Sequence, residues 1–315
     1  MVDSHNPELI KGMRQQEQKK IVQNLQSTKK DWDQLEVPKN IQSGLFSLSY
    51  DKPSIIQGVS LRKILDNPTC NFAFQAINGS GKTGAFLVPS LMRVDTNCPN
   101  IQVVVLAHSR ELIRQIYQVA LRIGKDSGVK IALGESNSSY DGAQLLVTTP
   151  GYLNSQLTSR NGKLDLKALK MLVYDEVDEL LIQYSIRSLI ESVLKVLTKL
   201  GCNWQSVLFS ATYNDSVVER IKELIGETEI YQISKEALKL KGVKNFVIHL
   251  NEAQKVDFAC ELHQDLDQAM TMVFVNKKDT AHSLQAKLKS KNIEAKVLTS
   301  KLDHTERDRM IDDFR

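Results

Sequence analysis

The stretch Asn-Phe-Ala-Phe-Gln-Ala-Ile-Asn-Gly-Ser-Gly-Lys-Thr at residues 71–83 joins an apolar run to a glycine-rich loop. The run Asn71–Ile77 predicts a buried strand, and the helix-like segment Gly84–Arg93 follows the loop. Gly79 and Gly81 permit backbone angles that turn N–H groups toward an anion. A strand, such a loop and a helix N-terminus in this order are typical of a phosphate-binding loop.

The side chains of this loop have separate expected tasks. Lys82 would reach the β- and γ-phosphates of a nucleotide, and Thr83 would bind Mg²⁺. Ala76 replaces the glycine of the strict pattern, and a glycine-rich surface turn is the alternative interpretation. The expected phosphate-binding residues are Gly79, Ser80, Gly81, Lys82 and Thr83.

A second signal lies at Met171–Asp178, which reads Met-Leu-Val-Tyr-Asp-Glu-Val-Asp. A buried strand there would deliver Asp175 and Glu176 at its carboxyl end. Asp175 suits a Mg²⁺ ion, which prefers oxygen ligands, and Glu176 suits the positioning of an attacking water. Alone, two carboxylates after a strand are more often a helix cap. The phosphate-binding loop upstream favours the catalytic interpretation.

The whole region from about residue 70 to 235 alternates short apolar runs with longer helix-like segments. This alternation predicts an α/β fold with a parallel sheet covered by helices on both faces. The predicted strands are Asn71–Ile77, Ile101–Ala107, Val129–Leu133, Gln144–Val147, Met171–Tyr174 and Ser206–Phe209.

Polar residues follow three further strands of this predicted sheet. They are the segments 108–112 (His-Ser-Arg-Glu-Leu), 148–151 (Thr-Thr-Pro-Gly) and 210–212 (Ser-Ala-Thr). Ligands of open α/β sheets bind beyond the carboxyl ends of the strands, so we expect these segments at one site. Each alone would be interpreted as a helix cap.

Upstream, residues 50–57 read Tyr-Asp-Lys-Pro-Ser-Ile-Ile-Gln. The Tyr50 ring offers a face for stacking on a purine. The Gln57 amide offers a donor and an acceptor, which match the adenine edge bearing N6 and N7. Composition alone favours a loop followed by a helix here.

A second block of the same alternation begins near residue 243 and ends at 315, shorter than a usual α/β domain. Its predicted strands are Val243–Leu250, Thr271–Val275 and Ile293–Leu298, and its predicted helices are Thr280–Ser290 and His304–Arg315. The predicted organisation is an N-terminal arm or weakly amphipathic helix (1–30), a nucleotide-binding domain (31–235), a linker (236–242) and part of a second domain (243–315).

Composition excludes several classes of protein. The chain has 315 residues, 42% of them hydrophobic and 25% charged, so it can bury a core without disulfides or a structural metal. Its four cysteines form no C-x-x-C pair, which fits a reducing compartment. We expect no secretory signal, because the N-terminus has no apolar h-region. We expect no membrane insertion, because no apolar run reaches about 18 residues. The net charge of +4 does not by itself indicate nucleic acid.

These motifs, in this order, resemble those of a DEAD-box RNA helicase of superfamily 2. Within that family the chain looks most like the mRNA-export helicases of the nuclear pore. The supporting segments of this subfamily likeness are Asp31–Leu35, Phe274–Thr280 and Glu306–Arg315. The family motifs are matched by Tyr50–Gln57 with Trp32 upstream, Ala76–Thr83, Ala107–Ile113, Thr149–Tyr152, Asp175–Asp178, Ser210–Thr212 and Phe274–Asn276.

The resemblance implies two RecA-like domains that close over ATP and single-stranded RNA. It implies contacts to RNA sugar and phosphate, largely without base readout. Asp178, Ser210 and Thr212 would couple hydrolysis to closure. The implied RNA-binding residues are Arg110, Thr149, Gly151 and Arg307. It further implies ATP and Mg²⁺ as cofactors, RNA or mRNP and export factors as partners, a monomer, and a location in cytoplasm and nucleus, at the cytoplasmic face of the pore.

The chain departs from the family pattern at several positions, namely Asn78, Ala107–His108, Tyr152, Val177 and His304. The printed residues also contain no His-Arg-Ile-Gly-Arg-like segment, which in the family supplies arginines to the transition state. Such an arginine is worth about 10³–10⁵ in rate. We therefore expect this chain alone to bind ATP but to hydrolyse it slowly, as a fragment or as a degenerate relative.

Two competing hypotheses remain. The chain could be a catalytically impaired ATP- and RNA-binding relative, which a reading frame ending at residue 315 would favour. It could instead be another phosphate-loop enzyme such as a DNA translocase, which equal use of GTP would favour. A helix within residues 8–30 could also lodge between the domains and inhibit turnover, against the alternative of a solvated tail.

Overall fold

The computed structural model describes residues 31–77, 79–136, 138–159, 164–232, 244, 246–266, 270–300 and 302–314, with the backbone of Lys20 and Ile21. The chain divides into two compact units, Met1–Lys239 and Leu240–Arg315, and each has its own core.

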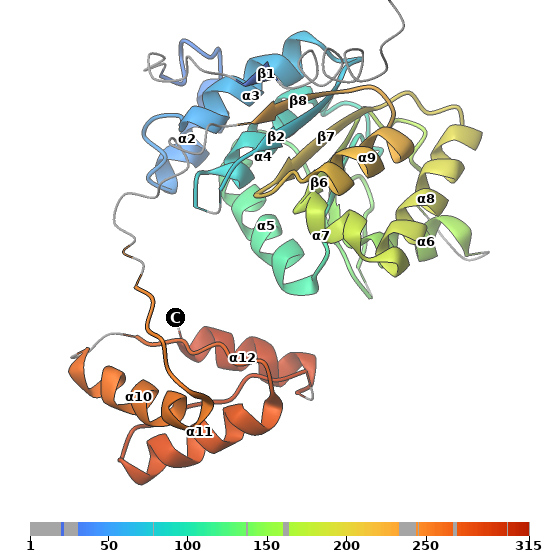
Figure 1. Ribbon diagram of the computed structural model, residues 1–315. Helices are drawn as coiled ribbons and strands as arrows, with labels where there is room; N and C mark the ends of the chain where they lie inside the picture. Colours follow the sequence, from blue (N-terminus) through green and yellow to red (C-terminus); the bar gives the residue numbers. More distant parts are fainter. Residues whose placement is uncertain are drawn as a thin grey trace, which may run out of the picture. The chain divides into compact units, whose positions relative to one another are not determined.

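The first unit is built on one sheet in which every described strand pairing is parallel (Figure 1). The order across the sheet is β1-β8-β2-β7-β6-β3-β5-β4. The strands are β1 Lys20–Ile21, β2 Asn71–Gln75, β3 Val103–Leu106, β4 Ile131–Gly134, β5 Leu145–Thr148, β6 Met171–Asp175, β7 Gln205–Ser210 and β8 Thr228–Gln232.

The six strands predicted for this unit are present, with ends shifted by up to two residues. β8 was not predicted, because its sequence Thr-Glu-Ile-Tyr-Gln is half polar and only Ile230 and Tyr231 are buried. β1 corrects the expected helix or disordered arm at Lys20–Ile21, where backbone pairing with β8 gives a two-residue strand. The rest of that arm lies outside the described residues.

Helices cover both faces of the sheet, as the continuous apolar strands predict. One face packs against α2 Lys39–Ser47, α3 Ile55–Asp66, α4 Lys82–Arg93 and α5 Arg110–Ile123. The other packs against α6 Pro150–Thr158, α7 Val177–Ile182, α8 Tyr184–Lys199 and α9 Asp215–Leu224.

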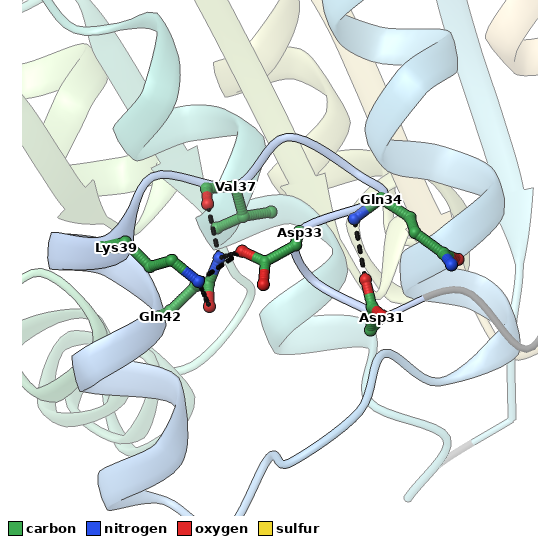
Figure 2. Close-up of polar contacts among 6 residues, drawn as sticks. All are labelled: Asp31, Asp33, Gln34, Val37, Lys39 and Gln42. Atoms are coloured by element: carbon green, nitrogen blue, oxygen red, sulfur yellow. Dashed lines mark hydrogen bonds and ion pairs between the residues drawn. The ribbon is translucent and has the colours of Figure 1, made fainter.

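The turns at residues 31–37 are tied to α2 by polar side chains (Figure 2). Nε2 of the buried Gln42 donates to Oδ1 of Asp33 and to the carbonyl of Val37, both at 2.7 Å. The Lys39 ammonium lies 2.6 Å from the same Asp33 carboxylate. The hydrogen bond from Gln42 and the Lys39 charge lower the pKa of Asp33. These contacts hold the entry to the domain against its first helix.

The second unit contains α10 Glu252–Asp265, α11 Lys278–Ser290 and α12 His304–Phe314, which confirms the two predicted helices. Its three predicted strands are wrong for the residues described there, because those segments form no backbone ladder. The described buried core of this unit is Cys260, Leu284 and Leu288, whereas Phe246 and Phe274 are 82% and 87% exposed. A parallel strand needs paired neighbours and covered faces, and the part of this unit that the structure describes provides neither.

Among the described helices, none is both long and apolar enough to cross a membrane. The four cysteines are free thiols, and Cys260 is buried.

Candidate active site

The loop between β2 and α4 adopts the conformation that its glycines predict. Gly79 and Gly81 have φ angles of +78° and +93°, where other residues would be strained. The Ser80 backbone N–H and hydroxyl both donate to the Ile77 carbonyl, at 3.2 and 2.7 Å. Lys82, the first residue of α4, is only 8% exposed. A fixed loop thus places a buried lysine at a helix N-terminus, which suits an anionic phosphate.

Gln57 lies beside this loop through contacts of its amide. Its side chain completes a capping box with Ser54 at the start of α3, and Oε1 accepts the Ser54 N–H at 2.8 Å. Nε2 donates to the carbonyl of Gly81 at 3.1 Å. The amide retains one N–H and acceptor capacity. A segment 24 residues upstream is therefore joined directly to the phosphate-binding loop.

Tyr50 lies near the same helix start. An ideal Cβ at Gly84 would fall 2.5 Å from Gln57 Nε2 and 3.6 Å from Tyr50 Cε2. The Tyr50 carbonyl accepts a hydrogen bond from the indole of Trp32 at 2.8 Å, and Trp32 is 2% exposed. Trp32 thus anchors the backbone that carries the tyrosine ring. The sequence did not identify Gly84, because its role depends on a contact made across the fold.

Asp175 ends β6 at the neighbouring part of the sheet edge and is 4% exposed. Burial raises its pKa to about 6, and the Lys82 charge opposes that shift. The Asp175 carboxylate accepts the Glu176 N–H at 3.1 Å. A carboxylate this far from water is stabilised by a nearby cation, so its environment suits a metal ion.

Glu176 occupies the N-cap position of α7 in the left-handed conformation, with φ 53° and ψ 55°. Its Oε2 lies 3.1 Å from Nδ1 of His108, which follows β3. Through this contact first, His108 lowers the pKa of Glu176, and Glu176 raises the pKa of His108. The sequence identified His108 only as a departure from a pattern. Its position beside Glu176 follows from the alignment of β3 with β6.

A hydrogen bond links the segments that follow β6 and β7. The Thr212 hydroxyl donates to Asp178 Oδ2 at 2.5 Å. Ser210 is buried at the end of β7, and its Oγ donates to the Thr212 carbonyl and accepts the Thr212 N–H. Gln75, at the end of β2, donates to the Ala211 carbonyl at 3.1 Å. The ends of β2, β7 and β6 are thereby connected.

Three of the four residues expected to bind RNA follow adjacent strands. Arg110 is the exposed first residue of α5, after β3. Thr149 caps α6, after β5, by accepting the Tyr152 N–H at 3.4 Å, and Gly151 is exposed. Arg307 lies in α12 of the second unit, so the first unit does not contain the whole predicted set.

Val177, the other departure next to the acidic pair, is fully buried in the core on the α6–α9 face. The valine side chain is thus accommodated by packing. Within the described residues, no three His, Cys, Asp or Glu side chains are grouped so that they could hold a metal ion. A Mg²⁺ ion here would depend on Asp175, Thr83 and phosphate oxygens together, as is usual for this ion.

A family model described as DEAD/DEAH box helicase matches residues 54–221, more than half of the chain. The ATP-dependent RNA helicase DBP5 of Candida albicans is 34% identical over 291 residues, which cover 91% of this chain. The chain spans 53% of that relative's length.

Solved structures of similar proteins agree with this match. S. cerevisiae Dbp5 bound to RNA and ADP BeF3 has a TM-score of 0.81 at 33% identity, covering 90% of this chain and 73% of that one. A Dbp5 variant bound to Nup159, a Gle1 variant, IP6 and ADP has a TM-score of 0.62 at 31% identity, covering 89% and 73% of the two chains.

Proposed function

The chain belongs to the DEAD/DEAH box helicase family, and on that basis we propose that it binds ATP and couples its hydrolysis to the remodelling of RNA or RNA–protein complexes. One observation carries this proposal. The ends of β2, β7 and β6 join the phosphate-binding loop, the acidic pair and the Ser210–Thr212 segment in one connected edge.

The residues at the carboxyl ends of these strands fit a nucleoside triphosphate. The backbone of Gly79, Ser80 and Gly81, with the Lys82 ammonium, would hold the phosphates. Thr83 and Asp175 would hold Mg²⁺, which would neutralise phosphate charge. Tyr50 and Gln57 would select adenine, by a ring face and by the donor and acceptor that the amide retains.

Hydrolysis needs a water aimed at the terminal phosphate. Glu176, at the start of α7, would orient that water and accept its proton. Asp178 and Thr212, joined by their hydrogen bond, would sense the nucleotide state between two strand ends. Arg110, Thr149 and Gly151, with Arg307 from the second unit, would contact RNA phosphates, which position a strand without reading its bases.

The finer role we propose is mRNA export. S. cerevisiae Dbp5 has been solved with RNA and with Nup159 and Gle1, and this chain is 33% and 31% identical to those structures. The proposed partners are therefore single-stranded RNA or mRNP and nuclear-pore export factors. The proposed oligomeric state is a monomer. The proposed location is the cytoplasm and nucleus, including the cytoplasmic face of the nuclear pore. The proposed divisions are 31–235 and 243–315, joined by 236–242.

We further propose that these 315 residues hydrolyse ATP slowly. The printed sequence has no His-Arg-Ile-Gly-Arg-like segment to stabilise the transition state.

The test compares the wild-type chain with Lys82→Ala in ATP binding and turnover, with and without single-stranded RNA. Loss of the buried ammonium should weaken ATP binding roughly 10- to 100-fold. Lys195→Ala, an exposed lysine on α8, is the matched control and should bind ATP normally. ATP turnover should be slow and little stimulated by RNA in both the wild-type chain and Lys82→Ala.

Three outcomes would contradict parts of the proposal. Absence of ATP binding by the wild-type chain would reject the nucleotide site. Equal affinity for GTP would reject the selection of adenine by Tyr50 and Gln57. Rapid RNA-stimulated turnover that Lys82→Ala abolishes would show that the missing arginine segment is not needed.

A further inference from the structure

The register of the sheet brings His108 and Glu176 together. Strands β3 and β6 are adjacent, and Leu106 pairs with Tyr174. Two residues further along each chain, the same offset aligns positions 108 and 176. Their side chains meet there, with Nδ1 of His108 3.1 Å from Oε2 of Glu176.

The backbone around His108 is held on both sides. The Ala107 N–H donates to the carbonyl of Thr148 at 3.2 Å, which ties the end of β3 to β5. The Ser109 side chain accepts the Leu112 N–H at 3.2 Å and so caps α5. Because Ser109 provides the cap, the imidazole of His108 is available for another role. A ring on such a support can fix the position of a group that it contacts.

The Glu176 side chain has little else to hold it. Although Glu176 occupies the N-cap position of α7, its carboxylate makes no capping hydrogen bond. Among the described residues, His108 is the side chain in polar contact with that carboxylate. The two side chains are 28% and 29% exposed, so solvent screens their attraction only in part.

The charges around the pair shift the pKa values of both side chains. The interaction with Glu176 raises the pKa of His108, burial opposes this, and the carboxylates of Glu179 and Asp175 add to the increase. On the other side of the pair, the Lys82 ammonium lowers the pKa of Glu176 and Asp178 raises it.

From this geometry we propose that His108 is a positioning residue that holds the Glu176 carboxylate in place for its work on the attacking water. This role rests on the proposed ATPase function. The family pattern does not predict this role, because it has another residue type where this chain has His108. His108 would act through Glu176 and not by contact with the nucleotide.

The test is single-turnover hydrolysis of radiolabelled ATP by an excess of the 315-residue chain. This assay can measure slow rates. His108→Ala should lower the rate at saturating enzyme about 5- to 20-fold and change the half-saturating concentration less than about 2-fold. His108→Asn keeps a polar nitrogen near the position of Nδ1 and should recover to within about 3-fold of wild type. His282→Ala, which removes an exposed imidazole from α11, should have no effect.

A double-mutant cycle tests whether His108 acts through Glu176. Glu176→Gln should lower the rate by about 100-fold or more, and adding His108→Ala should change it less than about 2-fold further. Independent, multiplicative losses would overturn the proposal. So would a His108→Ala effect confined to ATP affinity.

Imidazole NMR of the nucleotide-free chain tests the contact without hydrolysis. The His108 signal is identified by its loss in His108→Ala, and its pKa should fall in Glu176→Gln. An unchanged pKa would overturn the proposal. Absence of wild-type hydrolysis would reject both the ATPase function and the positioning role, whereas normal hydrolysis by His108→Ala would reject the positioning role alone.

Discussion

An ideal Cβ at Gly84 would lie 2.5 Å from Gln57 Nε2, closer than packed atoms approach. Gly84 is buried in the first turn of α4, directly behind the phosphate-binding loop. A hydrogen atom at this position lets the Gln57 amide reach the Gly81 carbonyl. At the residue scale, the junction between the adenine side and the phosphate side of the site therefore depends on a missing side chain.

Gly84→Ala should displace the Gln57 amide and weaken ATP binding by about 10-fold. The unfolding free energy should change by less than about 1 kcal/mol, because the displaced atom is the end of a flexible side chain and alanine favours the helix. Gly58→Ala is the matched control, because its Cβ would meet nothing within 4 Å in the interior of α3. That control should raise stability by about 0.5–1 kcal/mol and leave ATP binding unchanged. Isothermal titration and urea unfolding measure both quantities. Equal ATP affinity in the two variants would refute the argument.

At the scale of elements, the carboxyl ends of the strands and the segment before β2 both bring residues that are distant in sequence to the same side of the sheet. The Trp32 indole reaches the Tyr50 carbonyl and is buried in the core that also contains α2 and α3. Tyr50 directly precedes the turn into α3, whose capping box orients Gln57. The adenine-side residues are thus positioned by an element that lies before the main α/β alternation.

Trp32→Phe should destabilise the first unit by about 1–3 kcal/mol, since the Tyr50 carbonyl loses its donor. It should also weaken ATP binding several-fold, because the Tyr50 backbone is released. Trp204→Phe removes a hydrogen bond from the indole to Ser206 near the start of β7. This position lies at the amino-terminal end of the strand, away from the carboxyl ends that carry the proposed site. Thermal unfolding and nucleotide titration of both variants should therefore show lowered ATP affinity in Trp32→Phe only. The same affinity loss in both would contradict the assignment.

At the scale of the whole molecule, the proposed nucleotide residues all lie in the unit Met1–Lys239. This unit buries extensive apolar clusters on both faces of its sheet. Among the described residues of the second unit, three hydrophobic side chains are buried. The proposed RNA-binding set is divided between them, with Arg307 in the second unit. Nucleotide binding and RNA remodelling therefore make different demands on the chain.

A protein of residues 1–239 should bind ATP within about 3-fold of the full chain, because it contains all the proposed nucleotide residues and the apolar clusters on both faces of the sheet. It should show no RNA-stimulated turnover, since Arg307 and the rest of the second unit are removed. Calorimetric titration of ATP and a phosphate-release assay check these outcomes. ATP affinity reduced more than about 10-fold would mean that the second unit contributes to the nucleotide site.

Local patterns were enough to predict the strand–loop–helix unit at 71–93, the acidic pair after β6 and the two-faced parallel sheet. These features depend on residues close together in the chain, on apolar runs and on the backbone freedom of glycine. The same rules predicted strands in the second unit, where the described residues form no ladder. Apolar runs show that a segment can be buried, but pairing requires neighbours that the local sequence does not specify.

Contacts between distant positions were settled by the tertiary structure. The register of β3 on β6 places His108 against Glu176, and the packing of α3 on α4 places Gln57 against Gly81 and Gly84. Shifting a strand by one residue changes every such pair, and no local signal encodes that shift. The sequence therefore predicted which residue types lie at the carboxyl ends of the strands. Which side chains touch there was determined by register and packing.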